Sequence, residues 1–400
     1  VNDAWYGALT NIKENSQDDA IINSWWDFGH WFKYLADRRV SLDGGTQAGP
    51  PLHWLGKLMT TDDEKHSIGI LRMLDCGSNN AFVELDKSVK DTAKSVTILD
   101  KIVTQDKEEA ERTLSRIGLN SEQVASVVQY THCDAPEDFF ITSEDMVGKA
   151  GVWGHFGSWD FGRAEMYYRV KGVSLAEGKQ ILIEDKFNLT ETEAEKMYFD
   201  IQTADGNQWI TPWPGYIAGV KGCEGPTDGT ISCLHNVGGQ QMLFEVDLET
   251  MDVMIPASVD NVKPTSIVYP TKIGTKERKF EGTTVGLSLV LIPNGAGFNS
   301  MVVHPLLANS MFTRMFYMEG HGLKYYDRFD DRRQVTGGRI IVWKADWEGT
   351  DANEPFTATE PASEDPEVAA IEGEIDSSIE ELEELTEMSE VEDVVDDMEL

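Results

Sequence analysis

The pentapeptide Trp25-Trp26-Asp27-Phe28-Gly29 follows the apolar residues 20–22 and precedes residues 30–35, HWFKYL. This pattern predicts a strand, a tight turn and then a helix that runs to about residue 39. Asp27 is then expected at the N-cap, where its carboxylate accepts hydrogen bonds from free N–H groups of the first helical turn. Gly29 leaves the backbone bare, so that another group can approach it closely.

The same pentapeptide carries an unusual set of polar groups. An indole N–H is only a donor and an ionised carboxylate is only an acceptor, whereas a hydroxyl is one donor and two acceptors. Trp25, Trp26 and Asp27 together therefore match one serine or threonine hydroxyl. A site of this kind rejects the analogue that lacks the hydroxyl, because its own polar groups are left unpaired. The alternative is that both indoles are core residues and that Asp27 only caps a helix.

A second pattern lies at residues 91–98, DTAKSVTI, inside a stretch that we predict to be helical to about residue 104. Asp91, Lys94 and Ile98 are spaced i, i+3 and i+7, and this spacing places them on one helix face. Taken alone, the pattern equally describes a surface ion pair and one core isoleucine.

Together, W-W-D-x-G and D-x-x-K-x-x-x-I resemble the motifs of the archaeal oligosaccharyltransferase catalytic subunit, the enzyme of protein N-glycosylation. Over about residues 1–345 the chain is similar to its C-terminal part. The resemblance implies that the acceptor sequon Asn-x-Ser/Thr is bound by seven residues: Trp25, Trp26, Asp27, Gly29, Asp91, Lys94 and Ile98. The fourth position of the first motif, often Tyr in the family, is Phe28 here.

The resemblance also implies a role for each group. The two indoles donate to the +2 hydroxyl and Asp27 accepts its proton. Ile98 contacts the threonine methyl group, and Lys94 interacts electrostatically with Asp91 or Asp27. The reaction is the metal-dependent transfer of a dolichol-linked oligosaccharide to the sequon Asn of an acceptor protein.

In that family a multi-pass membrane part precedes the soluble domain and binds the catalytic Mn²⁺ or Mg²⁺. We therefore expect this chain to be the soluble domain on the extracellular face of an archaeal cell membrane, with its own membrane domain as a partner. We expect no metal site and no catalytic residue in this chain, and no activity from it alone. No stretch has the roughly 20 apolar residues of a membrane span.

The net charge of the chain limits the classes of partner that we expect. The chain has 34 Lys and Arg against 70 Asp and Glu, a formal net charge of −36. Residues 346–400 hold 22 of these acids and no Lys or Arg, which leaves −14 on the rest. Nucleic acid is therefore not an expected partner, because phosphate contacts need basic surface. We predict a disordered acidic tail over 346–400, with an amphipathic helix as the alternative.

The predicted fold class is α+β. A mainly helical central core covers 1–172, a β-rich insertion 173–303 and a return to the core 304–345. The insertion is predicted from strand-like apolar runs, of which 180–183 is the first, separated by Gly, Pro and Asn. Residues 159–162, WDFG, repeat part of the pentapeptide, but they lack the second indole and are interpreted as packing.

The cysteines form no C-x-x-C pair, so the sequence predicts no zinc framework. Cys223 and Cys233 flank a turn-rich loop, and a disulfide between them fits an oxidising location. Pairing of Cys76 with Cys133 stays open. Asn188 begins an Asn-x-Thr sequon and is a glycosylation candidate.

Two other functions are alternatives at this point. One is a glycoside hydrolase that uses two carboxylates, although this function leaves the helix at 91–98 unexplained. The other is a non-catalytic extracellular protein whose aromatic residues bind glycans.

Overall fold

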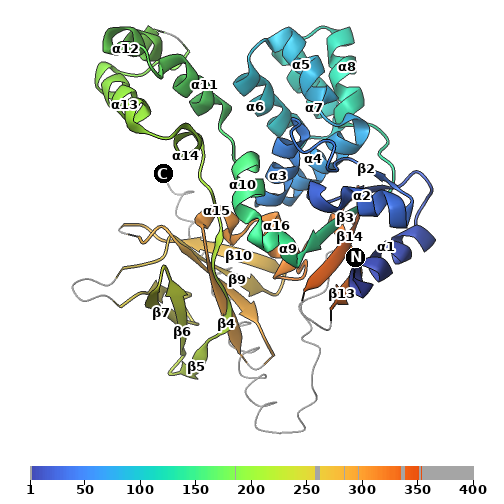
Figure 1. Cartoon of the computed structure of the whole chain (residues 1–400), viewed down its shortest axis with the longest axis vertical. Helices are drawn as coiled ribbons and strands as arrows, with labels where there is room; N and C mark the ends of the chain where they lie inside the picture. The colour runs from blue at the N-terminus through green and yellow to red at the C-terminus, as the bar shows by residue number, and fades with distance from the viewer. Residues whose placement is uncertain are drawn as a thin grey trace, which may run out of the picture. The chain divides into compact units, whose positions relative to one another are not determined.

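The computed structural model describes residues 2–350 and 353, apart from residue 185, 257–261, residues 283 and 296, and 335–337. The chain divides into two compact units. The first contains residues 2–216 and 309–353, and the second contains residues 217–308. The mixed α+β class predicted from the sequence is confirmed (Figure 1).

A five-stranded sheet organises the first unit. Its strands, in spatial order, are β13 (Tyr326–Arg333), β14 (Arg339–Ala345), β3 (Asp138–Ser143), β1 (Ile21–Asn23) and β2 (Arg39–Val40). Strand β1 runs parallel to both β2 and β3, whereas β14 is antiparallel to β3 and to β13.

Helix α1 (Asp3–Glu14) covers part of this sheet. Its residues Trp5, Leu9 and Ile12 form one apolar stripe and share a buried core with Ile22 and Val342. The period of 3.6 residues per turn brings the stripe to one face. This packing holds the sheet whose strand β1 leads into the pentapeptide.

The pentapeptide itself is less regular than predicted. Trp26–Phe28 form a 3₁₀ turn (η1), Gly29–Trp31 form one turn of α-helix (α2), and Phe32–Ala36 form a π-type turn (η2). The segment ends at Asp37, whose φ of 55° is left-handed. The helix predicted to run to residue 39 is therefore shorter, because the chain must turn there to enter β2.

Further helices cover residues 51–157 in the order α3 (Pro51–Thr60), α4 (Glu64–Gly77), α5 (Asn80–Val89), α6 (Thr92–Ile102), α7 (Lys107–Arg116), α8 (Ser121–Thr131), α9 (Glu144–Gly148) and α10 (Ala150–Gly157). Helices α3 and α10 meet at glycines. A Cβ on Gly56 would lie 2.4 Å from the carbonyl oxygen of Trp153, and one on Gly157 would lie 2.2 Å from the carbonyl carbon of Gly56. These glycines permit the close packing that places α10 beside α3.

The described residues from 161 to 210 are mostly helical, and the β-rich insertion predicted from 173 onwards is wrong over 173–210. The structure has α11 (Phe161–Val170), α12 (Leu175–Glu184), α13 (Glu191–Thr203) and α14 (Gly206–Ile210), seen together in Figure 1. The run 180–183 lies in α12, where Leu182 shares a buried core with Val170 and Ile201. A short apolar run fits a helix or a strand equally well by pattern alone, and packing decides between them. The segment predicted to begin the β-rich insertion at 173 is therefore helical to 210.

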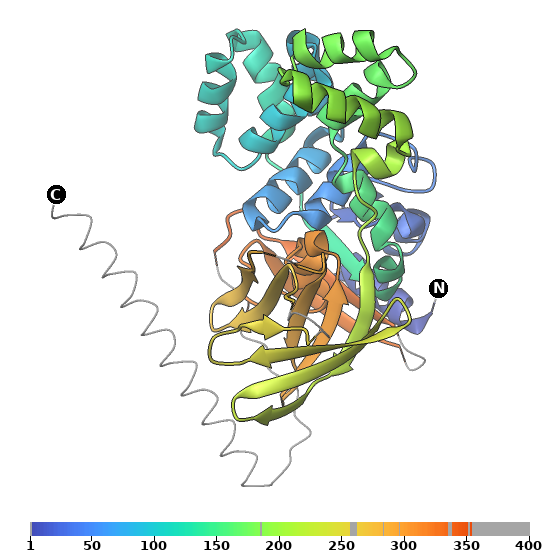
Figure 2. The same ribbon diagram turned by 90° about the vertical axis from the view of Figure 1, so that its left-hand side faces the viewer.

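The second unit is built of strands, drawn in yellow to orange in Figure 2. One sheet has the order β10 (Gly274–Lys279), β9 (Ser266–Thr271), β11 (Ser288–Pro293), β12 (Phe298–Val303) and β4 (Tyr216–Gly222), and the other has β5 (Glu224–Thr227), β6 (Thr230–Val237), β7 (Gln240–Asp247) and β8 (Val253–Met254). Phe244 of one sheet and Leu289 of the other belong to one buried core. A disulfide joins Cys223 to Cys233, and α15 (Pro305–Ala308) follows the last strand.

The chain then returns to the first unit through α16 (Met311–Phe316), β13 and β14. Beyond β14, the indole N–H of Trp347 donates to the carbonyl of Pro136 at 3.1 Å. Residues 346–350 are thus tied to the core rather than part of a free tail, because the half-buried Trp347 follows the last strand. The rest of the predicted acidic tail, 354–400, lies outside the described residues.

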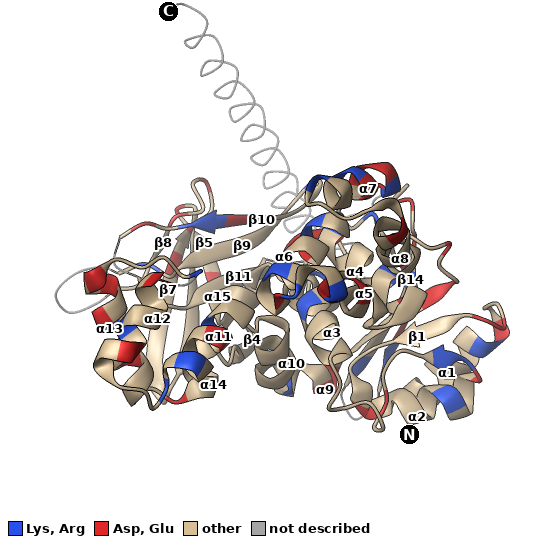
Figure 3. Cartoon of the chain, turned by 90° about the horizontal axis from the view of Figure 1, so that it is seen from above, with Lys and Arg blue, Asp and Glu red and all other residues tan. Residues whose placement is uncertain are grey.

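Charges of both signs lie close together on the surface. Helix α7 carries acidic and basic segments side by side (Figure 3), including an i, i+4 pair between Glu108 and Arg112 at 3.6 Å. Such exposed pairs contribute little to stability. Among the described residues, every helix is too short or too polar to cross a bilayer.

Candidate acceptor site

Strand β1 positions the pentapeptide. Its residues Ile21 and Ile22 are buried between β2 and β3, and the Ser24 hydroxyl donates to the carbonyl of Ile141 at 2.8 Å. Trp25 is still extended, with φ −60° and ψ 141°, and the backbone turns only at Trp26. The parallel strand thus delivers the two indoles and the carboxylate at its carboxyl end, where α/β proteins commonly place their sites.

Asp27 does not cap a helix, so this prediction is wrong. It lies within the 3₁₀ turn, and neither η1 nor α2 has a side-chain cap among the described residues. Its Oδ1 instead forms an ion pair with Lys149 Nζ at 3.0 Å, while its Oδ2 is buried and has no hydrogen-bond partner in the described part of the chain. A buried carboxylate oxygen without a donor is costly. The carboxylate is therefore held in place by one oxygen and left open for a donor at the other.

Lys149 is a site residue that the two motifs do not reveal. Its ammonium also pairs with Asp145 Oδ2 at 3.0 Å and lies 5.2 Å from the ring centroid of Phe28. Burial opposes the charge of Lys149, but the hydrogen bonds to Asp145 and Asp27 raise the pKa of its ammonium. Lys149 joins α9 to α10 directly after β3, so the parallel pairing of β1 with β3 brings it beside Asp27. The only sequence signal is that residues 139–153 repeat the strand–turn–helix pattern of the pentapeptide.

The two indoles complete the polar set. Trp25 is 2% exposed, and its ring centroid lies 6.5 Å from that of Phe156 on α10. Trp26 is half-buried. Neither indole N–H donates a hydrogen bond to any described residue. Two unused donors therefore stand next to the unused acceptor of Asp27 in sequence, which is the hydroxyl-matching set described above.

Gly29 allows a close approach, but the approaching group belongs to this chain. A Cβ on Gly29 would lie 2.3 Å from the carbonyl oxygen of Leu42 and 2.7 Å from the Cα of Asp43. Asp43 lies at the start of the loop that follows β2, accepts from Gly45 N at 2.8 Å and pairs with Lys33. The hydrogen bond from Lys33 lowers the pKa of the Asp43 carboxyl. Gly29 is thus needed so that this loop can pack on the motif.

The second motif starts α6. Asp91 is its N-cap and accepts from the backbone N–H of Lys94 at 3.1 Å, and its Oδ2 pairs with Lys186 at 2.7 Å. That pair lowers the pKa of the Asp91 carboxyl, with a smaller contribution from the charge of Lys94. Ile98 is buried, whereas the Lys94 side chain is exposed. The predicted electrostatic role of Lys94 thus stays a prediction, and the cation that pairs with Asp27 is Lys149.

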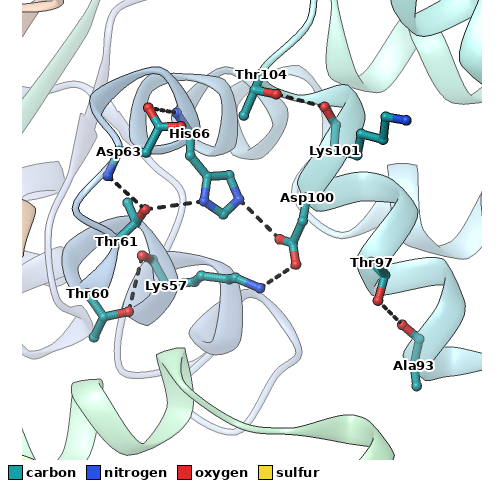
Figure 4. A network of polar contacts seen from close by, with 10 residues as sticks. All are labelled: Lys57, Thr60, Thr61, Asp63, His66, Ala93, Thr97, Asp100, Lys101 and Thr104. Carbon is teal, nitrogen blue, oxygen red and sulfur yellow. Dashed lines mark hydrogen bonds and ion pairs between the residues drawn. The ribbon is translucent and has the colours of Figure 1, made fainter. Parts of the chain in front are cut away.

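A polar network fixes α6 on the neighbouring helices. Asp100 near the end of α6 binds the ammonium of Lys57 on α3 and accepts from His66 Nε2 on α4 at 3.1 Å (Figure 4). Burial opposes the charge of Asp100, but these two partners lower the pKa of its carboxyl. Because α3 packs tightly on α10, this network connects the helix of the second motif to the helix that contacts Trp25.

Beneath the pentapeptide lies a buried polar triad. The amide of Asn23, at the end of β1, donates to Asp75 Oδ1 at 2.8 Å and to Asp138 Oδ2 at 2.6 Å. Burial raises the pKa of Asp75 to about 7, and burial together with the charge of Asp75 raises that of Asp138 well above its usual value. Cys76, next to Asp75, is disulfide-bonded to Cys133. The triad ties β1, β3 and α4 together directly below the site.

A cavity of about 450 Å³ opens beside the motif. Its wall includes Phe28 of the pentapeptide, Ser143, Glu144 and Asp145 at the end of β3, and Arg339 of β14. The segment that carries Asp27 and the segment that carries the partner of Lys149 thus border the same space. No group of three or more His, Cys, Asp or Glu side chains within the described ranges is arranged to hold a metal ion.

Residues 17–140 match the STT3/PglB/AglB core domain, and this range contains both motifs. These residues are therefore similar to the core domain of that family. The resemblance to archaeal oligosaccharyltransferases that the two motifs predicted is thereby confirmed.

Named relatives are similar to part of this chain. Over 166 residues, 40% of this chain and 18% of the relative, the chain is 36% identical to the dolichyl-phosphooligosaccharide-protein glycotransferase of Methanocaldococcus jannaschii. The dolichyl-phosphooligosaccharide-protein glycotransferase of Methanococcus voltae is 31% identical to this chain over 166 residues, which again are 40% of this chain and 18% of that relative. The matched stretch thus spans about a fifth of these relatives. The crystal structure of the C. jejuni PglB C-terminal domain has 12% identity and a TM-score of 0.39, covering 85% of this chain and 99% of that chain.

Two further predicted sites lie outside the core domain. The Cys223–Cys233 bond joins the residue before β5 to the middle of β6. Asn188 is exposed, with φ of 50°, between α12 and α13. Thr190 of its sequon is the N-cap of α13 and exchanges hydrogen bonds with Glu193 in a capping box. The hydroxyl of this sequon is therefore already used in the folded chain.

Proposed function

We propose that this chain is the acceptor-reading part of an oligosaccharyltransferase, which transfers a lipid-linked oligosaccharide to Asn in Asn-x-Ser/Thr. The observation that carries the proposal is the unused polar set of the pentapeptide. Asp27 keeps one buried oxygen without a donor, and Trp25 and Trp26 use neither indole N–H within the described residues. A hydroxyl supplies one donor and two acceptors and therefore satisfies all three groups.

Each residue then has a specific task. The indoles donate to the oxygen of the +2 Ser or Thr, and Asp27 Oδ2 accepts its proton. Lys149 is a positioning residue, because it binds Oδ1 and thereby directs Oδ2 away from itself. Ile98 contacts the methyl group of threonine and favours it over serine. One methyl group corresponds to about 1 kcal/mol at most, or roughly fivefold.

The transfer chemistry belongs to the whole protein. The oligosaccharide is activated by its lipid carrier, and the metal-dependent step is assigned to the membrane domain that such enzymes carry. We propose that the protein acts at an archaeal cell membrane with this domain on the extracellular face. This chain alone is expected to bind or orient the acceptor polypeptide and to show no transferase activity.

The test is peptide glycosylation in membranes from cells that express the protein. Asp27→Asn is expected to lower kcat/KM at least tenfold, because a hydrogen bond to a charged group contributes about 1.5–3 kcal/mol. The matched control is Asp160→Asn in the similar sequence at 159–162. Asp160 only accepts from Arg163 N as the N-cap of α11, and Asn replaces Asp well at that position.

The acceptor supplies the complementary test. Replacing Thr at +2 by Val keeps the shape and removes the hydroxyl, so transfer should fall by orders of magnitude in the unmodified protein. Transfer that is unchanged by Asp27→Asn, or equal for Thr and Val peptides, would contradict the proposed site.

A further inference from the structure

A second cavity, of about 480 Å³, lies on the helical side of the first unit. Its wall is mostly aromatic and aliphatic and comes from α3, α5, α6, α10 and α11. The residues used below are His53, Thr92, Val96, Phe156, Trp159 and Phe161. Ligand sites in proteins have this size and this composition, with a few polar groups that fix the orientation of the ligand.

One polar atom in this wall has no partner. His53 Nδ1 lies 2.9 Å from the carbonyl oxygen of Phe156. Because a carbonyl only accepts, Nδ1 must carry the proton, and in the neutral ring Nε2 is then an acceptor. His53 Nε2 is buried and has no hydrogen-bond partner among the described residues. Burial lowers the pKa of His53 to about 4, so the ring is neutral near pH 7 and Nε2 keeps its lone pair.

The Trp54 indole N–H, another polar group of the wall, is already satisfied. The indole N–H of Trp54 donates to Asn79 Oδ1 at 3.0 Å. The rings around His53 meet it edge to face, with centroid distances of 4.9 Å to both Trp54 and Phe161. An aromatic guest that brings a hydrogen-bond donor would match both the rings and the free acceptor.

The cavity shares a wall residue with the proposed acceptor site. Phe156 lines the cavity and packs against Trp25, with ring centroids 6.5 Å apart. Thr92 and Val96 lie on α6 between Asp91 and Ile98 of the second motif. An extended peptide advances about 3.3–3.6 Å per residue, so about two residues span the 6.5 Å between the rings of Phe156 and Trp25.

We propose that this cavity binds a tyrosine side chain of the acceptor polypeptide, a few residues from the hydroxyl that the pentapeptide reads. The phenol ring packs among Phe156, Trp159 and Phe161, and its hydroxyl donates to His53 Nε2. The assignment to an acceptor rests on the proposed function, whereas binding of a phenol to the cavity does not.

The first measurement uses p-cresol, the side-chain analogue of tyrosine, and toluene, the analogue of phenylalanine, with the 400-residue chain in ligand-observed NMR. We expect p-cresol to bind about fivefold more tightly than toluene, because one neutral hydrogen bond differs between them. Thr92→Trp should weaken p-cresol binding at least tenfold, because Thr92 is exposed at the cavity wall. Thr97→Trp, on an exposed part of α6 outside the cavity, should leave it unchanged. Equal binding of p-cresol and toluene, or p-cresol binding that Thr92→Trp leaves intact, would overturn the proposal.

The second measurement uses transfer in membranes that contain the protein. Asn-x-Thr peptides with Tyr at each flanking position are compared with Phe at the same position. At one position within four residues of the Thr, Tyr should raise kcat/KM about fivefold over Phe, and Thr92→Trp should remove this advantage. If Tyr gives no advantage over Phe in transfer, only the role of the cavity in acceptor binding is refuted. Transfer that Asp27→Asn does not affect would refute the proposed function, whatever the result with p-cresol.

Discussion

The buried pair Asp75 and Asp138 should make the first unit less stable as pH rises, and Asp75→Asn should remove the part of this effect that Asp75 contributes. Both carboxyls face the amide of Asn23, and each keeps one buried oxygen without a partner among the described residues. Asn at position 75 still accepts from Asn23 through its Oδ1. It also brings an N–H donor that can face Asp138, as a protonated Asp75 does.

The sign follows from proton uptake. Burial raises the pKa of Asp75 to about 7 in the folded chain, whereas an unfolded Asp has a pKa of about 3.9. Between these values the folded state holds a proton that the unfolded state has lost, so the free energy of unfolding falls as pH rises. About three units at roughly 1.4 kcal/mol each give a loss on the order of 4 kcal/mol by pH 7. The raised pKa of Asp138 continues the loss to higher pH.

Urea unfolding followed by tryptophan fluorescence at pH 5, 6, 7 and 8 measures this effect. Relative to the unmodified chain, Asp75→Asn should gain about 3 kcal/mol in the free energy of unfolding between pH 5 and pH 7 and should keep that gain at pH 8. The matched control is Asp91→Asn. The pair with Lys186 lowers the pKa of Asp91, so Asp91 is ionised in both states above pH 5 and its substitution should shift all four values equally. Parallel pH curves for Asp75→Asn and the unmodified chain would refute the reasoning.

Three further outcomes are expected. Lys149→Met should lower kcat/KM for peptide transfer several-fold and should add little in combination with Asp27→Asn, because Lys149 acts by holding that carboxylate; full additivity in the double variant would contradict this role. Ile98→Ala should reduce the preference for Thr over Ser peptides from about fivefold towards one. Any loss of folded protein cancels in this ratio of kcat/KM values. An unchanged ratio would contradict a contact between Ile98 and the threonine methyl group. Replacing Cys76 and Cys133 by Ser should lower the free energy of unfolding by about 4 kcal/mol, given their separation of 57 residues; detection of two free thiols in the denatured, unreduced chain would show that the bond is not formed.

The pentapeptide region could be predicted in part. The strand at β1 follows from its apolar run, and the functional hypothesis follows from the donors and acceptors of the side chains alone. The role of Asp27 as a helix cap was predicted wrongly. Local pattern does not show that a lysine more than a hundred residues later satisfies the same carboxylate, because the pairing of β1 with β3 brings Lys149 there.

The apolar run at 180–183 shows the same limit for the fold. Its residues fit a strand or a helix by pattern, and the helix forms because Leu182 packs against Val170 and Ile201. Gly29 is similar. The sequence predicts that some group approaches the Gly29 backbone closely, but the group that does so is the chain's own backbone at Leu42 and Asp43.

The sequence by itself determined the chemistry of this protein: two indole donors and a carboxylate in one turn, a second motif with helical spacing, and acidic charge that disfavours nucleic acid. Tertiary structure alone decided which of these groups stay free. Lys149 occupies one oxygen of Asp27 and leaves the other, Phe156 joins Trp25 to an aromatic cavity, and Asn23 gathers two carboxyls below them. The physical reason is that hydrogen-bonding capacity belongs to each residue type, whereas its satisfaction depends on neighbours that only the folded chain brings together.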